Sequence, residues 1–159
     1  HWPTADDNVY VDFVRDGLCG NASARSGEPR WRRRTEIRAG AAKSVFRFDV
    51  NGSVAKSTHA GLPWLLLLRR WVKRPLHFWP FDGWEFTAGR SVIAEVYPSL
   101  WSRGFARDER SQDQHDAYSA ARWLRQADLD GRISAFMTPS LTSAERTLAQ
   151  VEGWILGVM

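Results

Sequence analysis

Strand-like and helix-like segments alternate along the last two thirds of this 159-residue chain. Short runs rich in β-branched and aromatic residues predict strands over residues 44–50, 76–81 and 91–97. Apolar side chains at helical spacing predict helices over residues 62–73, 113–124 and 141–151. This alternation is typical of an α/β fold, in which helices cover a sheet. It argues against the all-α and all-β classes.

The length of the chain bounds the number of domains. A chain of 159 residues can form one domain with a hydrophobic core but is too short for two ordinary domains. We therefore expect a single domain over residues 1–159. Within it, we expect residues 1–30 to form a helical and loop segment. The apolar residues over 4–20 have helical spacing, and a loop follows them. Residues 9–14 also suit a strand.

Two features of the sequence bear on the cellular setting. The longest apolar run, residues 62–68, is far shorter than the about 20 residues that cross a membrane, so we expect no membrane partner. The single cysteine, Cys19, allows neither an internal disulfide bond nor a cysteine-based zinc cluster. We therefore expect a reducing, cytoplasmic setting.

Charge and tryptophan content suggest two kinds of partner. The chain has 22 Lys and Arg against 18 Asp and Glu, a formal net charge of +4 that favours a polyanion such as nucleic acid. It also has nine tryptophans. Because Trp is costly to leave in water, many of them must pack in the core or line a contact surface, and a homo-oligomer is one way to bury that surface.

Three carboxylates are the best candidates for chemistry. The motifs of phosphate-loop NTPases, dinucleotide-dependent oxidoreductases, esterases and zinc proteases do not occur in the sequence. Glu95 interrupts an apolar strand, where an ionised side chain needs a partner or a metal. Asp113 and Asp116 lie three residues apart at the start of a predicted helix and so project from one side. If this helix meets the end of the Glu95 strand, the three carboxylates converge. They would then suit Mg²⁺ or Mn²⁺ and phosphodiester hydrolysis.

The same residues also fit structural roles. Asp113 and Asp116 fit capping and dipole compensation at a helix N-terminus, and Glu95 fits a core ion pair with an arginine. The basic run over residues 30–34 fits phosphate binding, with its tryptophan stacking on a base, but the run alone favours a solvated face. Glu36 fits a simple pair with one of these arginines. The spacing alone leaves these alternatives open.

Seven short segments follow one another in a characteristic order and spacing. They are Arg34-Thr35-Glu36, Lys43-Ser44-Val45-Phe46, Gly61-Leu62-Pro63, Trp79-Pro80-Phe81-Asp82, Glu95-Val96-Tyr97-Pro98, Asp113-Gln114-His115-Asp116-Ala117 and Glu152-Gly153-Trp154. Together, over about residues 34–158, they resemble the bacterial and archaeal proteins of domain of unknown function family 429. Those proteins are predicted nucleases with an RNase H-like fold.

The resemblance implies a mixed sheet flanked by helices and a nuclease that depends on Mg²⁺ or Mn²⁺. In RNase H-like folds the last metal-binding acids come from a late helix, and Asp113-x-x-Asp116-Ala117 looks like that helix in the related Holliday-junction resolvases. The implied catalytic and metal-binding residues are Glu95, Asp113 and Asp116. The implied substrate-binding residues are Arg32, Arg33, Arg34, Glu36 and Lys43. The alternative is a module of the same fold that binds nucleic acid or protein without catalysis.

The sequence departs from the family at its beginning. Family members usually start with a strand that carries Asp, and a second acid-bearing strand ending in Gly-x-Pro precedes the Arg-Thr-Glu segment. Neither is present here, and Asp12 resembles the first-strand acid only superficially. We therefore expect the later part of such a protein, with an incomplete active site. Expressed alone, it should expose an apolar sheet edge and so oligomerise or be poorly soluble.

Overall fold

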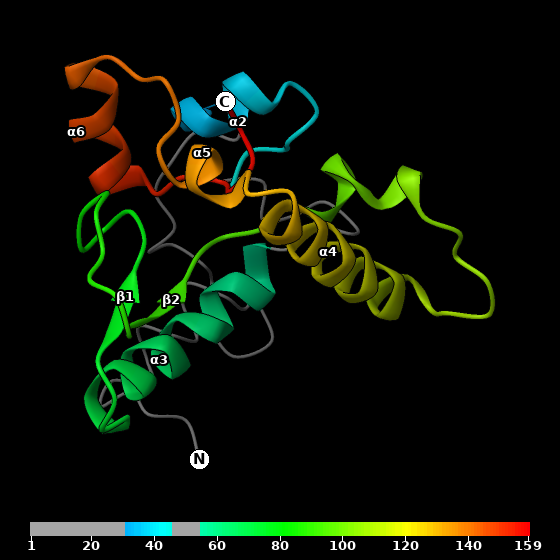
Figure 1. Cartoon of the computed structure of the whole chain (residues 1–159), viewed down its shortest axis with the longest axis horizontal. Helices are drawn as coiled ribbons and strands as arrows, with labels where there is room; N and C mark the ends of the chain where they lie inside the picture. Colours follow the sequence, from blue (N-terminus) through cyan, green and yellow to red (C-terminus); the bar gives the residue numbers. More distant parts are fainter. Residues whose placement is uncertain (1–30, 46–54) are drawn as a thin grey trace, which may run out of the picture. The chain divides into compact units, whose positions relative to one another are not determined.

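The computed structural model describes residues 31–45 and 55–159 (Figure 1). The prediction for residues 1–30 and most of the strand predicted over residues 44–50 lie outside this part of the chain. The chain divides into two compact units. The first comprises His1–Arg32 and Lys43–Pro75, and the second comprises Arg33–Ala42 and Leu76–Met159. The single domain that we expect from the length stays a prediction, and each unit is described by itself.

The main described element of the first unit is helix α3, Ala55–Trp71. It begins seven residues before the predicted start at residue 62, so Pro63 lies in the helix interior rather than near its beginning. Proline has no N–H to donate to the carbonyl four residues back, and it therefore removes one hydrogen bond from the helix. The helix ends before Pro75, as the sequence predicts.

The second unit contains a small parallel sheet. Strands β1 (Leu76–Phe78) and β2 (Ser91–Ile93) pair in register, with His77 opposite Val92 (Figure 1). Both strands are shorter than the sequence predicts. Beyond β1 the chain turns at once, because the N–H of Asp82 donates to the Phe78 carbonyl at 2.9 Å. Beyond β2, Glu95 forms an isolated parallel bridge with Ile155, so the predicted strand is divided between two partners.

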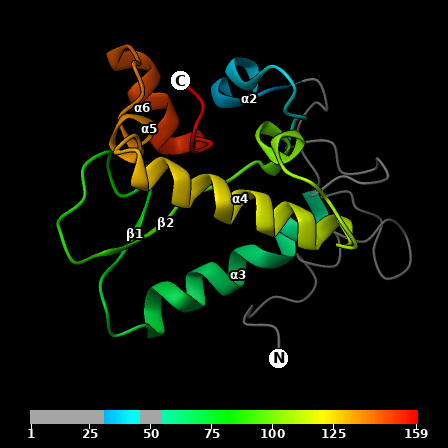
Figure 2. The same ribbon diagram turned by 45° about the vertical axis from the view of Figure 1, so that its right-hand side comes forward.

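The described part of the second unit also contains four helices and two 3₁₀ turns. They are α2 (Arg34–Ala39), α4 (Gln112–Leu129), α5 (Ile133–Met137) and α6 (Ser143–Glu152), with single 3₁₀ turns η1 (Pro98–Leu100) and η2 (Ser102–Gly104). The long helix α4 packs against η1 and η2, and α2 packs against α6 (Figure 2). The predicted helix over residues 113–124 is thus confirmed and runs five residues further. The described part of the chain thus mixes helices with a parallel pair of strands, which is compatible with the predicted α/β class.

The hydrophobic core of the second unit lies around residues 153–159, which follow α6 and are called the C-terminal segment below. Its buried members are Ala42, Trp79, Ala149, Trp154, Ile155, Leu156 and Val158. The ring of Trp84 lies edge-on to Trp79, with centroids 5.3 Å apart, and close to Trp154. Some tryptophans therefore pack in the core as the composition requires, whereas Trp71 on α3 is 77% exposed. No helix in the described part of the chain is long and apolar enough to cross a membrane.

Candidate functional site

Arg33 lies at the centre of the first cluster of candidate residues. Its Nη1 and Nη2 atoms donate to Oε2 and Oε1 of Glu95, each at 2.7 Å. Its Nε donates to Oε1 of Glu36 at 2.8 Å, and Nη1 also reaches the carbonyl of Glu152 at 3.1 Å. Two parallel N–H···O bonds of this kind fix both the position and the plane of the carboxylate.

Burial and charge act in opposite directions on Arg33. Burial by itself lowers the pKa of its guanidinium, but the hydrogen bonds and charges of Glu95 and Glu36 outweigh burial and raise the pKa above its ordinary value. Arg33 is therefore a permanent cation held by two carboxylates. Glu36 also caps helix α2, because its second oxygen accepts the backbone N–H of Arg33 at 3.0 Å.

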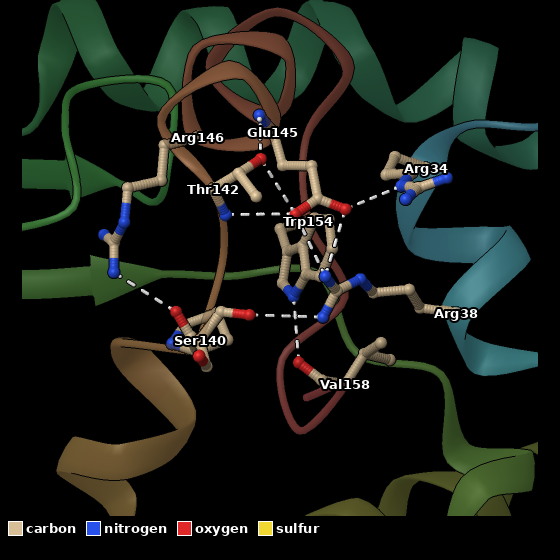
Figure 3. Close-up of polar contacts among 9 residues, drawn as sticks. Arg34, Arg38, Ser140, Thr142, Glu145, Arg146, Trp154 and Val158 are labelled. Carbon is tan, nitrogen blue, oxygen red and sulfur yellow. Dashed lines mark hydrogen bonds and ion pairs between the residues drawn. The ribbon is translucent and has the colours of Figure 1, made fainter.

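Glu145 forms a second cluster at the start of α6. It accepts a hydrogen bond from Nε of Arg34 at 2.8 Å, and both its oxygens lie 3.0 Å from Nη2 of Arg38. Figure 3 shows the two arginines reaching Glu145 from α2, with Thr142 beside it. The hydrogen bond from the Thr142 backbone, followed by that from Arg34, lowers the pKa of Glu145 to about 2.

Both clusters tie α2 to the C-terminal part of the chain. The backbone N–H of Arg34 donates to Oε2 of Glu152 at 2.9 Å. The backbone N–H of Ile155 donates to Oγ1 of the fully buried Thr35, also at 2.9 Å. In the C-terminal segment itself, the indole N–H of Trp154 donates to the Val158 carbonyl at 3.0 Å (Figure 3). The arginines of α2 thus hold together segments more than one hundred residues apart in sequence.

The predicted substrate-binding residues are divided between the two units. Arg33 and Arg34 are used in ion pairs, and Glu36 is only 1% exposed. Arg32 is exposed and belongs to the first unit, as does the exposed Lys43. The alternatives in which Glu95 and Glu36 each pair with an arginine are therefore confirmed. The Glu95 pair does not lie in the core, however, because the Glu95 side chain is 42% exposed.

Asp113 and Asp116 both lie at the start of α4. Asp113 stands exposed in the first turn, where its charge favours the helix dipole. Asp116 accepts a hydrogen bond from Nε2 of Gln112 at 2.9 Å. The capping residue is instead Ser111, whose hydroxyl accepts the N–H of Gln114 at 3.3 Å. The N-terminal helix position is confirmed, whereas capping by these aspartates is not.

The expected convergence of Glu95, Asp113 and Asp116 is not found. Among residues 31–45 and 55–159, no group of three or more His, Cys, Asp or Glu side chains is placed to hold a metal ion. Glu95 turns toward Arg33 and the C-terminal segment, and the turns η1 and η2 separate it in sequence from α4. The donor set required for Mg²⁺ or Mn²⁺ is thus not assembled around Glu95, whose two oxygens already accept from Arg33.

Sequence reasoning missed Arg38, Glu145 and Glu152. A local signal existed for Glu145, because Thr142-x-x-Glu145 has the spacing of a capping box, and the structure contains that box. No local pattern indicates which arginines pair with Glu145, because Arg38 lies 107 positions away in the sequence.

Comparison with known proteins identifies no relative of this chain. No family model matches the chain, and neither the curated proteins nor the solved structures include a significant match. The resemblance to domain of unknown function family 429 and the RNase H-like topology accordingly stay predictions.

Proposed function

We propose that this chain is a nucleic-acid-binding module of RNase H-like type that works without a metal centre at Glu95. The observation that carries this proposal is the bidentate pair between Arg33 and Glu95, with both N–O distances at 2.7 Å. A divalent ion that used Glu95 would have to displace a guanidinium that Glu36 and the Glu152 carbonyl also hold. Arg33 already supplies the positive charge that this carboxylate needs.

Nucleic acid is the partner class that the charge supports. The chain carries a formal net charge of +4, and a polyanion releases counterions when it meets such a surface. The direct test is fluorescence anisotropy with a labelled oligonucleotide over a range of salt concentrations, together with a cleavage assay in Mn²⁺. We expect binding that weakens steeply with salt and no metal-dependent cleavage. Salt-insensitive binding, or none, would refute the proposal.

A metal-dependent nuclease is the second candidate. Glu95 lies just beyond the carboxyl end of β2 in a parallel pair, the edge at which α/β proteins commonly place their sites. This placement of Glu95 favours the hydrolytic alternative that the resemblance implies, although Asp113 and Asp116 on the first turns of α4 do not converge with it.

Calorimetric titration with Mn²⁺ tests the second candidate. The nuclease proposal expects Asp116→Asn to lose Mn²⁺ binding relative to the unmodified chain. Asp128→Asn is the matched control, because Asp128 is an exposed acid near the other end of the same helix. Equal weak binding by all three proteins would remove Asp116 from any metal site. Sedimentation of the same samples measures the self-association that we also expect.

A further inference from the structure

We propose that the C-terminal end of α3 is the surface that contacts the nucleic acid, and that its ligand is single-stranded. The surface consists of Arg70, Trp71, Lys73 and Arg74, and is called the α3 end below. This inference rests on the proposed function and adds the location and the strand class of the ligand. Arg70 and Trp71 are the last two residues of the helix, and Lys73 and Arg74 lie in the bend that follows.

The cations of the α3 end are exposed and have no acidic partner among the residues that the structure describes. Arg70, Lys73 and Arg74 are all exposed, and none forms an ion pair within the described part of the chain. Arg33, Arg34 and Arg38 differ, because Glu36, Glu95 and Glu145 neutralise them. Three uncompensated cations close together in sequence are suited to consecutive phosphates.

The sequence around the α3 end contains no opposing charge. No Asp or Glu occurs between residues 50 and 81, whereas the same stretch carries five Lys and Arg. Cations at a helix C-terminus also interact favourably with the helix dipole. That role accounts for Arg70 but not for Lys73 and Arg74, which continue the positive charge beyond the helix. The complementary partner of this surface is therefore an anion.

Trp71 identifies the class of anion. Its side chain is 77% exposed, more than any other aromatic side chain that the structure describes. An exposed indole beside phosphate-binding cations stacks on a nucleobase, and such stacking accepts any base. In a duplex the faces of the bases are stacked on one another, so only an unpaired base can cover the indole. The α3 end thus has both components of a single-strand contact, the cations and the stacking ring.

Anisotropy with fluorescein-labelled oligothymidylate on the full chain tests this assignment. We expect Trp71→Leu to weaken binding about tenfold and Trp71→Phe, which keeps an aromatic face, to weaken it less. The double variant Arg70→Gln, Lys73→Gln should reduce the slope of log K against log salt by about 1.4, since each single-strand phosphate contact contributes about 0.7. Arg122→Gln, Arg125→Gln is the matched control: it removes two exposed cations from α4 and should leave the slope unchanged.

Each outcome bears on the proposal in a defined way. If the oligonucleotide binds with steep salt dependence but the α3 variants behave as the control does, the location is wrong and the proposed function stands. If no oligonucleotide binds, both are wrong. Equal binding of the annealed duplex would refute the single-strand assignment. Two further outcomes would overturn the proposal. If Trp71→Leu abolishes retention on anionic vesicles but keeps oligonucleotide binding, the α3 end binds lipid. If Trp71→Leu abolishes a dimer seen in sedimentation but keeps oligonucleotide binding, the α3 end serves self-association.

Discussion

Both carboxylate oxygens of Glu95 accept hydrogen bonds from Arg33, a residue 62 positions earlier in the sequence. Glu95 follows β2 and Arg33 precedes α2, so this pair joins the sheet to the first helix of the second unit. The side chain of Arg33 is 12% exposed and that of Glu95 is 42% exposed. The guanidinium of Arg33 is therefore largely shielded from water, and it binds Glu95, Glu36 and the Glu152 carbonyl at the same time.

The first prediction concerns the loss of Arg33. We expect Arg33→Ala to lower the free energy of unfolding by about 3 kcal/mol, because both Glu95 and Glu36, which is 1% exposed, would lose the guanidinium that they share. Urea denaturation measures this change. Arg32→Ala is the control, since Arg32 is exposed and its removal should cost less than about 0.5 kcal/mol. Equal stability of the two variants would show that the network is not stabilising.

The second prediction is the pH dependence contributed by Glu145. Its pKa in the folded protein is about 2, below the ordinary 4.5, so the unfolded chain takes up the proton first as the pH falls. The stability that Glu145 contributes is present above pH 4.5 and is lost as the pH falls from 4.5 toward 2. Glu145→Gln should therefore be less stable than the unmodified chain at neutral pH, and the difference should shrink near pH 2.

Urea denaturation at several pH values measures this difference. Glu85→Gln is the control, because Glu85 is exposed and forms no ion pair in the described part of the chain. A difference between Glu145→Gln and the unmodified chain that stays constant with pH would exclude ion pairing as the source of the stabilisation.

Local sequence signals predicted two of the longer helices well but neither of the short helices α2 and α5. The spacing over residues 113–124 predicted most of α4, and that over residues 141–151 predicted most of α6, which Gly153 ends with φ of 81°. The strands were less predictable. An apolar run cannot show that its backbone changes partner, and residues 91–97 pair first with β1 and then, through Glu95, with Ile155.

The candidate site was only partly predictable for the same reason. An isolated carboxylate in an apolar strand indicates that a partner exists, and this inference about Glu95 is confirmed. Nothing local distinguishes a metal from a distant arginine as that partner. The same limit applies to Glu145, whose partners Arg34 and Arg38 belong to a helix more than one hundred residues away.

The third prediction concerns the hydroxyl of Thr35. Its Oγ1 accepts the backbone N–H of Ile155 at 2.9 Å, and both residues are buried. Thr35→Val has nearly the same shape but would leave that N–H without an acceptor, so we expect a loss of about 1–3 kcal/mol in the free energy of unfolding. Thr35→Ser keeps the acceptor and should lose less. If the serine and valine variants are equally destabilised, packing rather than the hydrogen bond explains the effect.

The last prediction concerns the close approach of the chain at Gly153. This glycine has φ of 81°, a backbone conformation that other residues rarely adopt. A Cβ atom at this position would lie 2.9 Å from Cζ of Phe81 and 3.4 Å from Nη1 of Arg33. Gly89 has nearly the same φ, 84°, but a Cβ there would meet no atom within 4 Å. The two glycines therefore separate backbone strain from steric contact.

Gly89→Ala should lose about 1 kcal/mol in the free energy of unfolding, from backbone strain alone. Gly153→Ala should lose clearly more, because the added methyl group must also move the Phe81 ring or the guanidinium that pairs with Glu95. Phe81→Ala in the Gly153→Ala background should recover part of the difference, since it removes the nearer obstacle. Equal losses in the two glycine variants would mean that Phe81 and Arg33 yield freely, and that the Arg33–Glu95 pair is not held rigidly by the C-terminal segment.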